Sequence, residues 1–101
     1  MKPEFHPEAD EEFREAARYY ESEAPGVGLA FVAEVYKATA ELAEFPLTAQ
    51  IVRGSIRRKV LPHFPYSLLY SVEPTKIVIV AVAHQRRRPT YWLSRLRKPS
   101  R

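Results

Sequence analysis

The sequence contains no cysteine and only three glycines among its 101 residues. Without cysteine, disulfide bonds and thiolate sites are excluded, and the composition suits the reducing cytoplasm. Histidine is also scarce: His6, His63 and His84 are scattered and lack the spacing of metal ligands. We therefore expect neither a metal site nor another cofactor.

Long apolar runs are missing as well. The longest, residues 77–83, is far shorter than the roughly 20 residues that a transmembrane helix needs. The first residues, MKPEFHPEADEEF, include no apolar stretch typical of a secretory signal. With 46% apolar and 28% charged side chains, the chain is typical of one globular domain over residues 1–101. We expect a cytoplasmic protein without membrane contact.

Acidic side chains are nearly absent from the second half of the chain. Residues 51–101 carry 12 basic and 1 acidic side chain, a net charge of +11, whereas residues 1–50 carry 4 basic and 11 acidic, a net charge of −7. This asymmetry predicts an anionic partner for the basic half, either nucleic acid or an acidic protein segment. The alternative is that the two halves neutralise each other within the fold.

The first half has the pattern of two helices. Apolar side chains at helical spacing and acidic residues near the start predict a helix over residues 8–23. An Ala-Pro-Gly sequence at residues 24–26 ends it, and a second apolar seam predicts a helix over residues 28–44. Because the turn is so short, the two helices should form an antiparallel αα-hairpin. We expect a solvated face for the most conspicuous acids of this half, Asp10, Glu11, Glu15, Glu34 and Glu41.

The second half has the pattern of β-strands. Three strand signals follow one another over residues 56–61, 66–73 and 76–84. The gaps between them are short enough only for antiparallel returns. Residues 3–7 contain two prolines and suit only an edge strand, residues 47–54 are interpreted as a connector, and residues 90–97 predict a short helix or a frayed tail. The expected fold class is α+β, with a short N-terminal strand and an αα-hairpin packed on an antiparallel β-meander.

The stretch KIVIVAVAHQRRRPTYW, residues 76–92, joins the most apolar strand to the segment richest in functional side chains. The apolar run at residues 77–83 predicts a strand buried on both faces in the middle of the sheet. It delivers His84, three consecutive arginines and two aromatic side chains to one place. In the preceding strand, the more apolar face should meet the helical hairpin; it consists of Tyr66, Leu68, Tyr70 and Val72.

This order of elements resembles the RelE/ParE superfamily of toxins from bacterial type II toxin–antitoxin systems, in the form often labelled plasmid stabilisation protein. The resemblance covers nearly the whole chain and rests on FHPEADEEFREAARYYE, IRRKVLPHFPYSLLYSVE and IVIVAVAHQRRRPTYW. It implies a small cytoplasmic growth inhibitor with a RelE/ParE-like fold. It also implies a cognate antitoxin, a small acidic protein whose C-terminal segment wraps around the toxin in a hetero-oligomer.

The superfamily divides by mechanism. RelE-like members cleave messenger RNA on the ribosome, whereas ParE-like members poison DNA gyrase by binding. His84 and Tyr91 are the candidate catalytic residues if this chain is a ribonuclease. Ribonucleolytic members commonly carry an arginine just before the L-x-Y pattern of the middle strand, where this chain has Tyr66 and Ser67. That absence favours a ParE-like toxin; the alternatives are a ribosome-dependent mRNA endoribonuclease and a non-toxic nucleic-acid-binding module.

Basic side chains are the candidates for contact with the target or the antitoxin: Arg57, Lys59, Arg86, Arg87 and Arg88. Three adjacent side chains cannot all point one way, so at least one of the last three should be a solvated surface charge. Strand alternation places Arg58 on the face opposite Arg57 and Lys59. There, an ion pair with a helix carboxylate competes with ligand contact.

Several candidates also have a structural interpretation. His84 can equally be a strand-end histidine hydrogen-bonded to backbone or to a tyrosine. Trp92 is expected to pin the C-terminal segment to the sheet, while Tyr91 either does the same or stacks on a partner. Tyr66 and Tyr70 are expected to line the core, with their hydroxyls at its rim.

Overall fold

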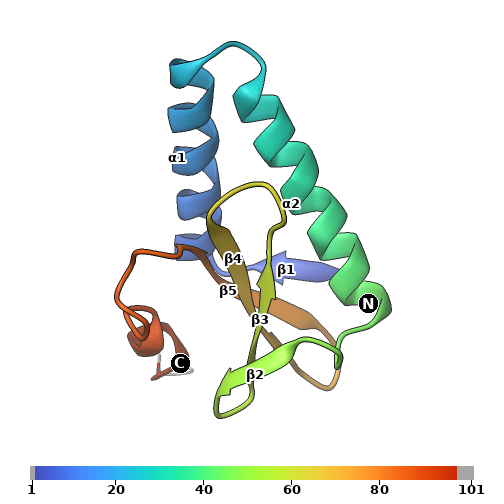
Figure 1. The fold of residues 1–101 in the computed structure, drawn as a ribbon. Helices are drawn as coiled ribbons and strands as arrows, with labels where there is room; N and C mark the ends of the chain where they lie inside the picture. Colours follow the sequence, from blue (N-terminus) through green and yellow to red (C-terminus); the bar gives the residue numbers. More distant parts are fainter. Residues whose placement is uncertain (1, 98–101) are drawn as a thin grey trace.

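The computed structural model of the protein describes residues 2–97. Two long helices lie side by side over one face of a five-stranded sheet (Figure 1). The helices are α1 (Pro7–Glu23) and α2 (Val27–Glu44). The strands are β1 (Pro3–Phe5), β2 (Gln50–Arg53), β3 (Ile56–Val60), β4 (Tyr66–Val72) and β5 (Ile77–His84), and the 3₁₀-helix η1 (Leu93–Arg97) follows. The predicted α+β class is confirmed. No helix within residues 2–97 is long and apolar enough to span a bilayer.

The turn between the helices depends on Glu21 and on two glycines. The Glu21 carboxylate accepts hydrogen bonds from the backbone N–H groups of Gly26 and Gly28, each at 2.9 Å, and so caps α2. These bonds, the one from Gly26 first, lower the pKa of Glu21. Gly26 has a φ of +90°, which side chains rarely allow, and a Cβ at Gly28 would lie 2.6 Å from the carbonyl oxygen of Ala17. The close approach of the two helices therefore requires glycine at this end.

The sheet has the order β1-β5-β4-β3-β2. Strand β1 is parallel to β5, which confirms an edge strand near the N-terminus, and the other neighbours are antiparallel. The interpretation of residues 47–54 as a plain connector is wrong, because Gln50–Arg53 form the edge strand β2. All four side chains of β2 are exposed, so the strand has no buried face and shows no apolar alternation.

Strand β5 lies between β1 and β4, as its continuous apolar run predicts. Its pairing with β4 contains a β-bulge: Tyr70 lies opposite Ile79, and Leu69 lies opposite Ala81. Val80 therefore has no partner across the ladder. Val80 and Ala81 belong to the same hydrophobic cluster, on the sheet face away from the helices. Beyond the bulge, the alternation of side chains is shifted by one residue.

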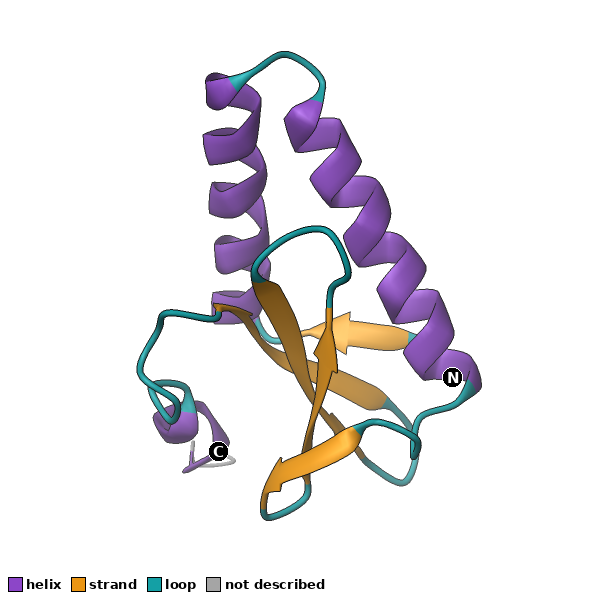
Figure 2. Ribbon diagram, viewed as in Figure 1, coloured by secondary structure: helices purple, strands orange, loops and turns teal. Residues whose placement is uncertain are grey.

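Each face of the sheet carries its own hydrophobic cluster, and the helices lie over one face only (Figure 2). The larger cluster joins the helices to β4 and β5; it includes Phe31 and the fully buried Tyr70, whose hydroxyl donates a hydrogen bond to the carbonyl oxygen of Pro46 at 2.7 Å. The smaller cluster surrounds Trp92, which is 2% exposed, and includes Leu69. The predicted role of Trp92 in pinning the C-terminal segment to the sheet is thereby confirmed.

Candidate binding cleft

A cleft of about 250 Å³ opens on the sheet face away from the helices. Strand side chains of Ser67, Leu69 and Ala83 form its floor. Its walls come from β2, from β3 and from the segment after β5, here called the C-terminal strap (residues 85–97). The cleft is therefore assembled from parts of the chain that are distant in the sequence.

Arginine dominates the lining of this cleft. Among residues 2–97, no acidic side chain lines it, whereas four arginines do: Arg53 of β2, Arg58 of β3, and Arg87 and Arg88 of the strap. All four residues are exposed, so a bound molecule can reach them. Such a cluster creates a positive potential, and guanidinium groups donate paired hydrogen bonds to carboxylates and phosphates. The cleft is therefore suited to binding an anionic partner.

The structure brings together two of the five predicted contact residues. Arg87 and Arg88 line the cleft, while Arg86, between them and β5, lies outside its lining. We expected that these three adjacent side chains would not all point one way, and the structure agrees. Only part of the arginine run thus contributes to the cleft.

The other two predicted contact residues, Arg57 and Lys59, make contacts within the protein. Arg57 Nη1 donates hydrogen bonds to the carbonyl oxygens of Leu47 at 3.0 Å and Ala49 at 2.8 Å. Lys59 forms an ion pair with Glu41 of α2 at 2.9 Å. Both side chains connect β3 to α2 or to the residues that follow it, on the side of the sheet opposite the cleft.

The sequence patterns do not single out Arg53 or Arg58 as cleft residues. Alternation correctly places Arg58 on the face opposite Arg57, but that face points away from the helices, so the alternative of an ion pair with a helix carboxylate does not hold. Lys59 forms that ion pair instead. Arg53 lies in the exposed strand β2, where no pattern assigns a face. For Arg58, the alternation of β3 is the signal that identifies the open side.

His84 lies at the edge of the cleft, at the end of β5. Its ring meets the ring of Tyr66 edge-on, with centroids 5.1 Å apart. Its Nδ1 atom accepts a hydrogen bond from the backbone N–H of Arg86 at 3.0 Å. Because Nδ1 is an acceptor, the neutral ring carries its proton on Nε2. This is the structural interpretation expected for a strand-end histidine, and it leaves Nε2 for any further contact.

The remaining histidines also bind nearby groups. His6 Nδ1 accepts a hydrogen bond from the backbone N–H of Glu8 at 3.1 Å and caps α1. His63 Nδ1 lies 2.9 Å from Glu34 Oε1, and the Glu34 side chain is only 12% exposed. Glu34 is therefore not part of a solvated acidic face, contrary to the prediction. No group of three or more histidine, aspartate or glutamate side chains within the described residues is placed to hold a metal ion.

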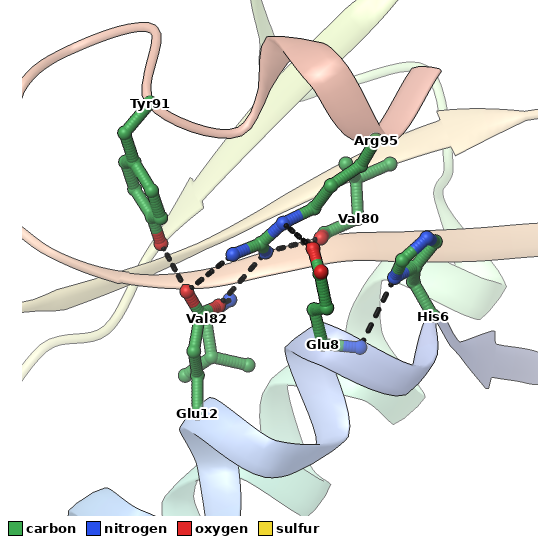
Figure 3. A network of polar contacts seen from close by, with 7 residues as sticks. All are labelled: His6, Glu8, Glu12, Val80, Val82, Tyr91 and Arg95. Atoms are coloured by element: carbon green, nitrogen blue, oxygen red, sulfur yellow. Dashed lines mark hydrogen bonds and ion pairs between the residues drawn. The ribbon is translucent and has the colours of Figure 1, made fainter. Parts of the chain in front are cut away.

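A polar network centred on Glu12 fastens the strap to α1 and β5 (Figure 3). Glu12 Oε2 accepts hydrogen bonds from the Tyr91 hydroxyl at 2.7 Å and from Arg95 Nη2 at 2.8 Å. Glu12 Oε1 accepts from the backbone N–H of Val82 at 2.9 Å and from Arg95 Nη1 at 3.1 Å. Arg95 Nη1 also donates to the carbonyl oxygen of Val80 at 2.9 Å. The Arg95 and Glu12 side chains are 10% and 16% exposed, so the ion pair is largely buried.

The network shifts the pKa of two of its members, Tyr91 and Arg95. Burial, followed by the hydrogen bond to Glu12, raises the pKa of Tyr91 well above its ordinary value. Burial alone would lower the pKa of Arg95, but the hydrogen bonds and the charge of Glu12 raise it. The Tyr91 hydroxyl therefore keeps its proton near neutral pH and donates a hydrogen bond to Glu12.

The Tyr91 ring also packs against one of the cleft arginines. The guanidinium carbon of Arg87 lies 3.7 Å from the centre of the Tyr91 ring, a cation–π contact.

Sequence patterns do not single out Glu12. The available signal is that Glu8 and Glu12 lie one helical turn apart and are opposite in charge to the strap, but no pattern shows that the strap returns to α1.

The chain matches the family model of the ParE toxin of type II toxin–antitoxin systems (parDE) over residues 4–89. Its fold is similar to that of a solved chain from the chromosomal ParDE toxin–antitoxin system of P. aeruginosa, with a TM-score of 0.71 and 17% sequence identity. That match covers 83% of this chain and 95% of the solved one. At this low sequence identity, the similarity supports a shared fold and nothing more. No curated protein matches the sequence.

Proposed function

The chain belongs to the ParE toxin family of type II toxin–antitoxin systems, and from this premise we propose that it stops growth by binding and poisoning DNA gyrase. In this proposal residues 1–101 act as one toxin domain in the cytoplasm, and the basic cleft makes the contact. A toxin–antitoxin system implies a cognate antitoxin as partner. The proposal extends this to a hetero-oligomer in which an acidic antitoxin segment covers the cleft.

One observation favours binding over RNA cleavage: the Tyr91 hydroxyl is already bonded to Glu12 at 2.7 Å. A general base must be able to take a proton near the working pH and must reach the group that gives it. The Tyr91 hydroxyl donates a hydrogen bond to a carboxylate, and its pKa is raised, so it is unsuited to that task. The cleft offers guanidinium groups and aromatic rings, which are contacts for binding.

The arginines to which the proposal assigns target contact are the ones that line the cleft. Arg53, Arg58, Arg87 and Arg88 converge on one concave surface, whose lining contains no acidic side chain from the part of the chain that the structure describes. Losing one side of a buried charge contact at an interface typically costs about 2–5 kcal/mol, so these side chains should dominate the affinity for an anionic surface. Arg57 and Lys59 support β3 through their contacts with the carbonyl oxygen of Ala49 and with Glu41, so the proposal assigns the main target contacts to the cleft arginines.

Expression of three variants in cells tests the proposal. Arg87→Ala with Arg88→Ala should weaken growth inhibition strongly, by about 30-fold or more in the toxin level required, because two cleft contacts are lost. His84→Gln should weaken it only modestly. Arg86→Ala is the matched control, since the neighbouring arginine lies outside the cleft lining. Growth arrest should be accompanied by a DNA-damage response.

The same cells distinguish the nuclease alternative. Primer extension on messenger RNA should show no new cuts during growth arrest. General acid–base residues contribute roughly 10²–10⁴-fold in rate, so a nuclease that uses His84 would lose almost all activity in His84→Gln. Codon-phased cuts that disappear in this variant would overturn the proposal.

A further inference from the structure

The edge of β5 changes its partner where β1 ends. Strand β1 pairs with β5 only as far as Ile79. Beyond that point, within the described residues, side chains take over the hydrogen bonds of this edge: Glu12 accepts from the N–H of Val82, and Arg95 donates to the carbonyl oxygen of Val80. Next to the bulge at Val80, the Glu12–Arg95 ion pair thus makes the hydrogen bonds that further residues of an edge strand would otherwise make.

The same carboxylate is linked to the cleft through Tyr91, which itself belongs to the lining, and Tyr91 in turn contacts the lining residue Arg87. Glu12 accepts the hydrogen bond of the Tyr91 hydroxyl, and the Tyr91 ring lies under the guanidinium group of Arg87 at 3.7 Å. Arg87 lines the cleft, whereas Glu12 does not. Glu12 is thus tied to a cleft residue without touching what the cleft binds.

We propose that Glu12 is a positioning residue for the basic cleft. By holding Tyr91 and Arg95, it fixes the strap so that Arg87 and Arg88 stand across the cleft from the arginines of β2 and β3. The inference rests on the proposed function in one respect, that the target binds in this cleft. The fastening residues of the strap, Tyr91 and Arg95, lie beyond residues 4–89, the part that matches the family model.

Glu8 provides a matched control on the same helix. It also pairs with Arg95, at 2.8 Å, but its side chain is 64% exposed, and it lies one turn before Glu12. Exposed ion pairs contribute little because water screens them. If the buried carboxylate positions the strap, Glu12→Gln should loosen it and Glu8→Gln should not.

Trp92 makes the position of the strap measurable. It is the only tryptophan of the chain, follows Tyr91 directly and is 2% exposed. In Glu12→Gln we expect its fluorescence to be quenched by acrylamide more strongly than in the unmodified protein, because a loosened strap exposes the indole ring to the quencher. Glu8→Gln should remain close to the unmodified protein. A Trp92 that stays equally protected in Glu12→Gln overturns the proposal.

A double-mutant cycle distinguishes positioning from a general loss of structure. The affinity for purified DNA gyrase is measured for Glu12→Gln, for Arg87→Ala with Arg88→Ala, and for all three changes together. If Glu12 acts through these two arginines, Glu12→Gln lowers affinity by about tenfold alone and adds little once both arginines are removed. Losses that multiply across the two changes overturn the proposal. If Glu12→Gln fails to fold, Tyr91→Phe removes only the hydroxyl link, and the same two results are required of it.

The two proposals fail in different ways. If Arg87→Ala with Arg88→Ala binds gyrase as well as the unmodified protein, the proposed function is wrong. The quenching of Trp92 needs no target, so it still decides whether Glu12 holds the strap.

Discussion

Glu12 connects three segments that are distant in the sequence: it lies on α1, accepts a backbone hydrogen bond from β5 and binds Tyr91 and Arg95 of the strap. Its four hydrogen bonds leave the carboxylate well satisfied although it is largely buried. A buried ion pair contributes little net stability compared with apolar side chains, but removing one partner leaves an uncompensated charge. The strap therefore depends on both members of the pair.

Removal of Arg95 tests this dependence. Arg95→Met leaves Glu12 buried without its cation, so the free energy of unfolding should fall by about 3–5 kcal/mol. The exposed pair Asp10–Arg14 on α1 is the control: its side chains are 42% and 66% exposed, and Arg14→Met should cost no more than about 1 kcal/mol. Urea unfolding followed by circular dichroism measures both. Equal losses in the two variants would contradict the account of the network.

Tyr91 makes stability depend on alkaline pH. Its pKa in the folded protein is raised, whereas in the unfolded chain it lies at about 10. The unfolded state therefore releases the proton first, so this contribution is complete below about pH 10 and is lost as the pH rises further. In Tyr91→Phe the fall in unfolding free energy between pH 9 and 11, a range of about two units, should be shallower. The exposed Tyr36→Phe should keep the steep fall; identical curves for both variants would contradict the assignment.

At the scale of elements, the helices were predictable and the edge strand β2 was not. Each helix has a buried stripe at helical spacing, for example Ala9, Phe13 and Ala16 on α1, and this stripe is visible in the sequence. Strand β2 buries nothing, so it leaves no pattern. The parallel pairing of β1 with β5 and the bulge at Val80 are likewise set by tertiary contacts.

The helical hairpin carries a steric prediction at Gly28. A Cβ there would lie 2.6 Å from the backbone carbonyl oxygen of Ala17, so α1 and α2 must separate to accommodate Gly28→Ala. Overpacking of this kind typically costs about 1–3 kcal/mol, and we expect a loss of stability in that range although alanine favours helices. Thermal unfolding of Gly28→Ala and of the exposed Ala33→Gly, a helix-propensity control, measures it. An increase in stability in Gly28→Ala would contradict the packing described.

At the scale of the whole molecule, the charge asymmetry has two outcomes. Part of it is neutralised between the halves, by Glu41 with Lys59 and by Glu12 with Arg95. Another part gathers in the cleft, where four arginines have no acidic neighbour in the lining among residues 2–97. The sequence indicates a basic surface near the end of β5 but does not indicate which arginines share it, because the cleft joins β2, β3 and the strap through the tertiary fold.

This distribution of charge predicts how the antitoxin associates. Long-range attraction between the cleft and an acidic segment should make the association rate fall as salt is added, since the screening length shrinks to about 10 Å at 0.1 M ionic strength. Stopped-flow mixing with the antitoxin at increasing salt measures this, and Arg87→Ala with Arg88→Ala should flatten the dependence. An association rate that is indifferent to salt, or a docking site on the outer faces of α1 and α2, would contradict the prediction.

The most direct measurement is the cleavage of supercoiled plasmid by purified DNA gyrase in the presence of the purified toxin. A binding poison traps gyrase on cut DNA, so linear plasmid should accumulate with the unmodified protein and with Arg86→Ala. Arg87→Ala with Arg88→Ala should require about 30-fold more protein for the same effect, the lower limit for lost interfacial charge contacts. Supercoiled plasmid that stays uncut with the unmodified protein would contradict the proposal that this toxin acts on gyrase through its basic cleft.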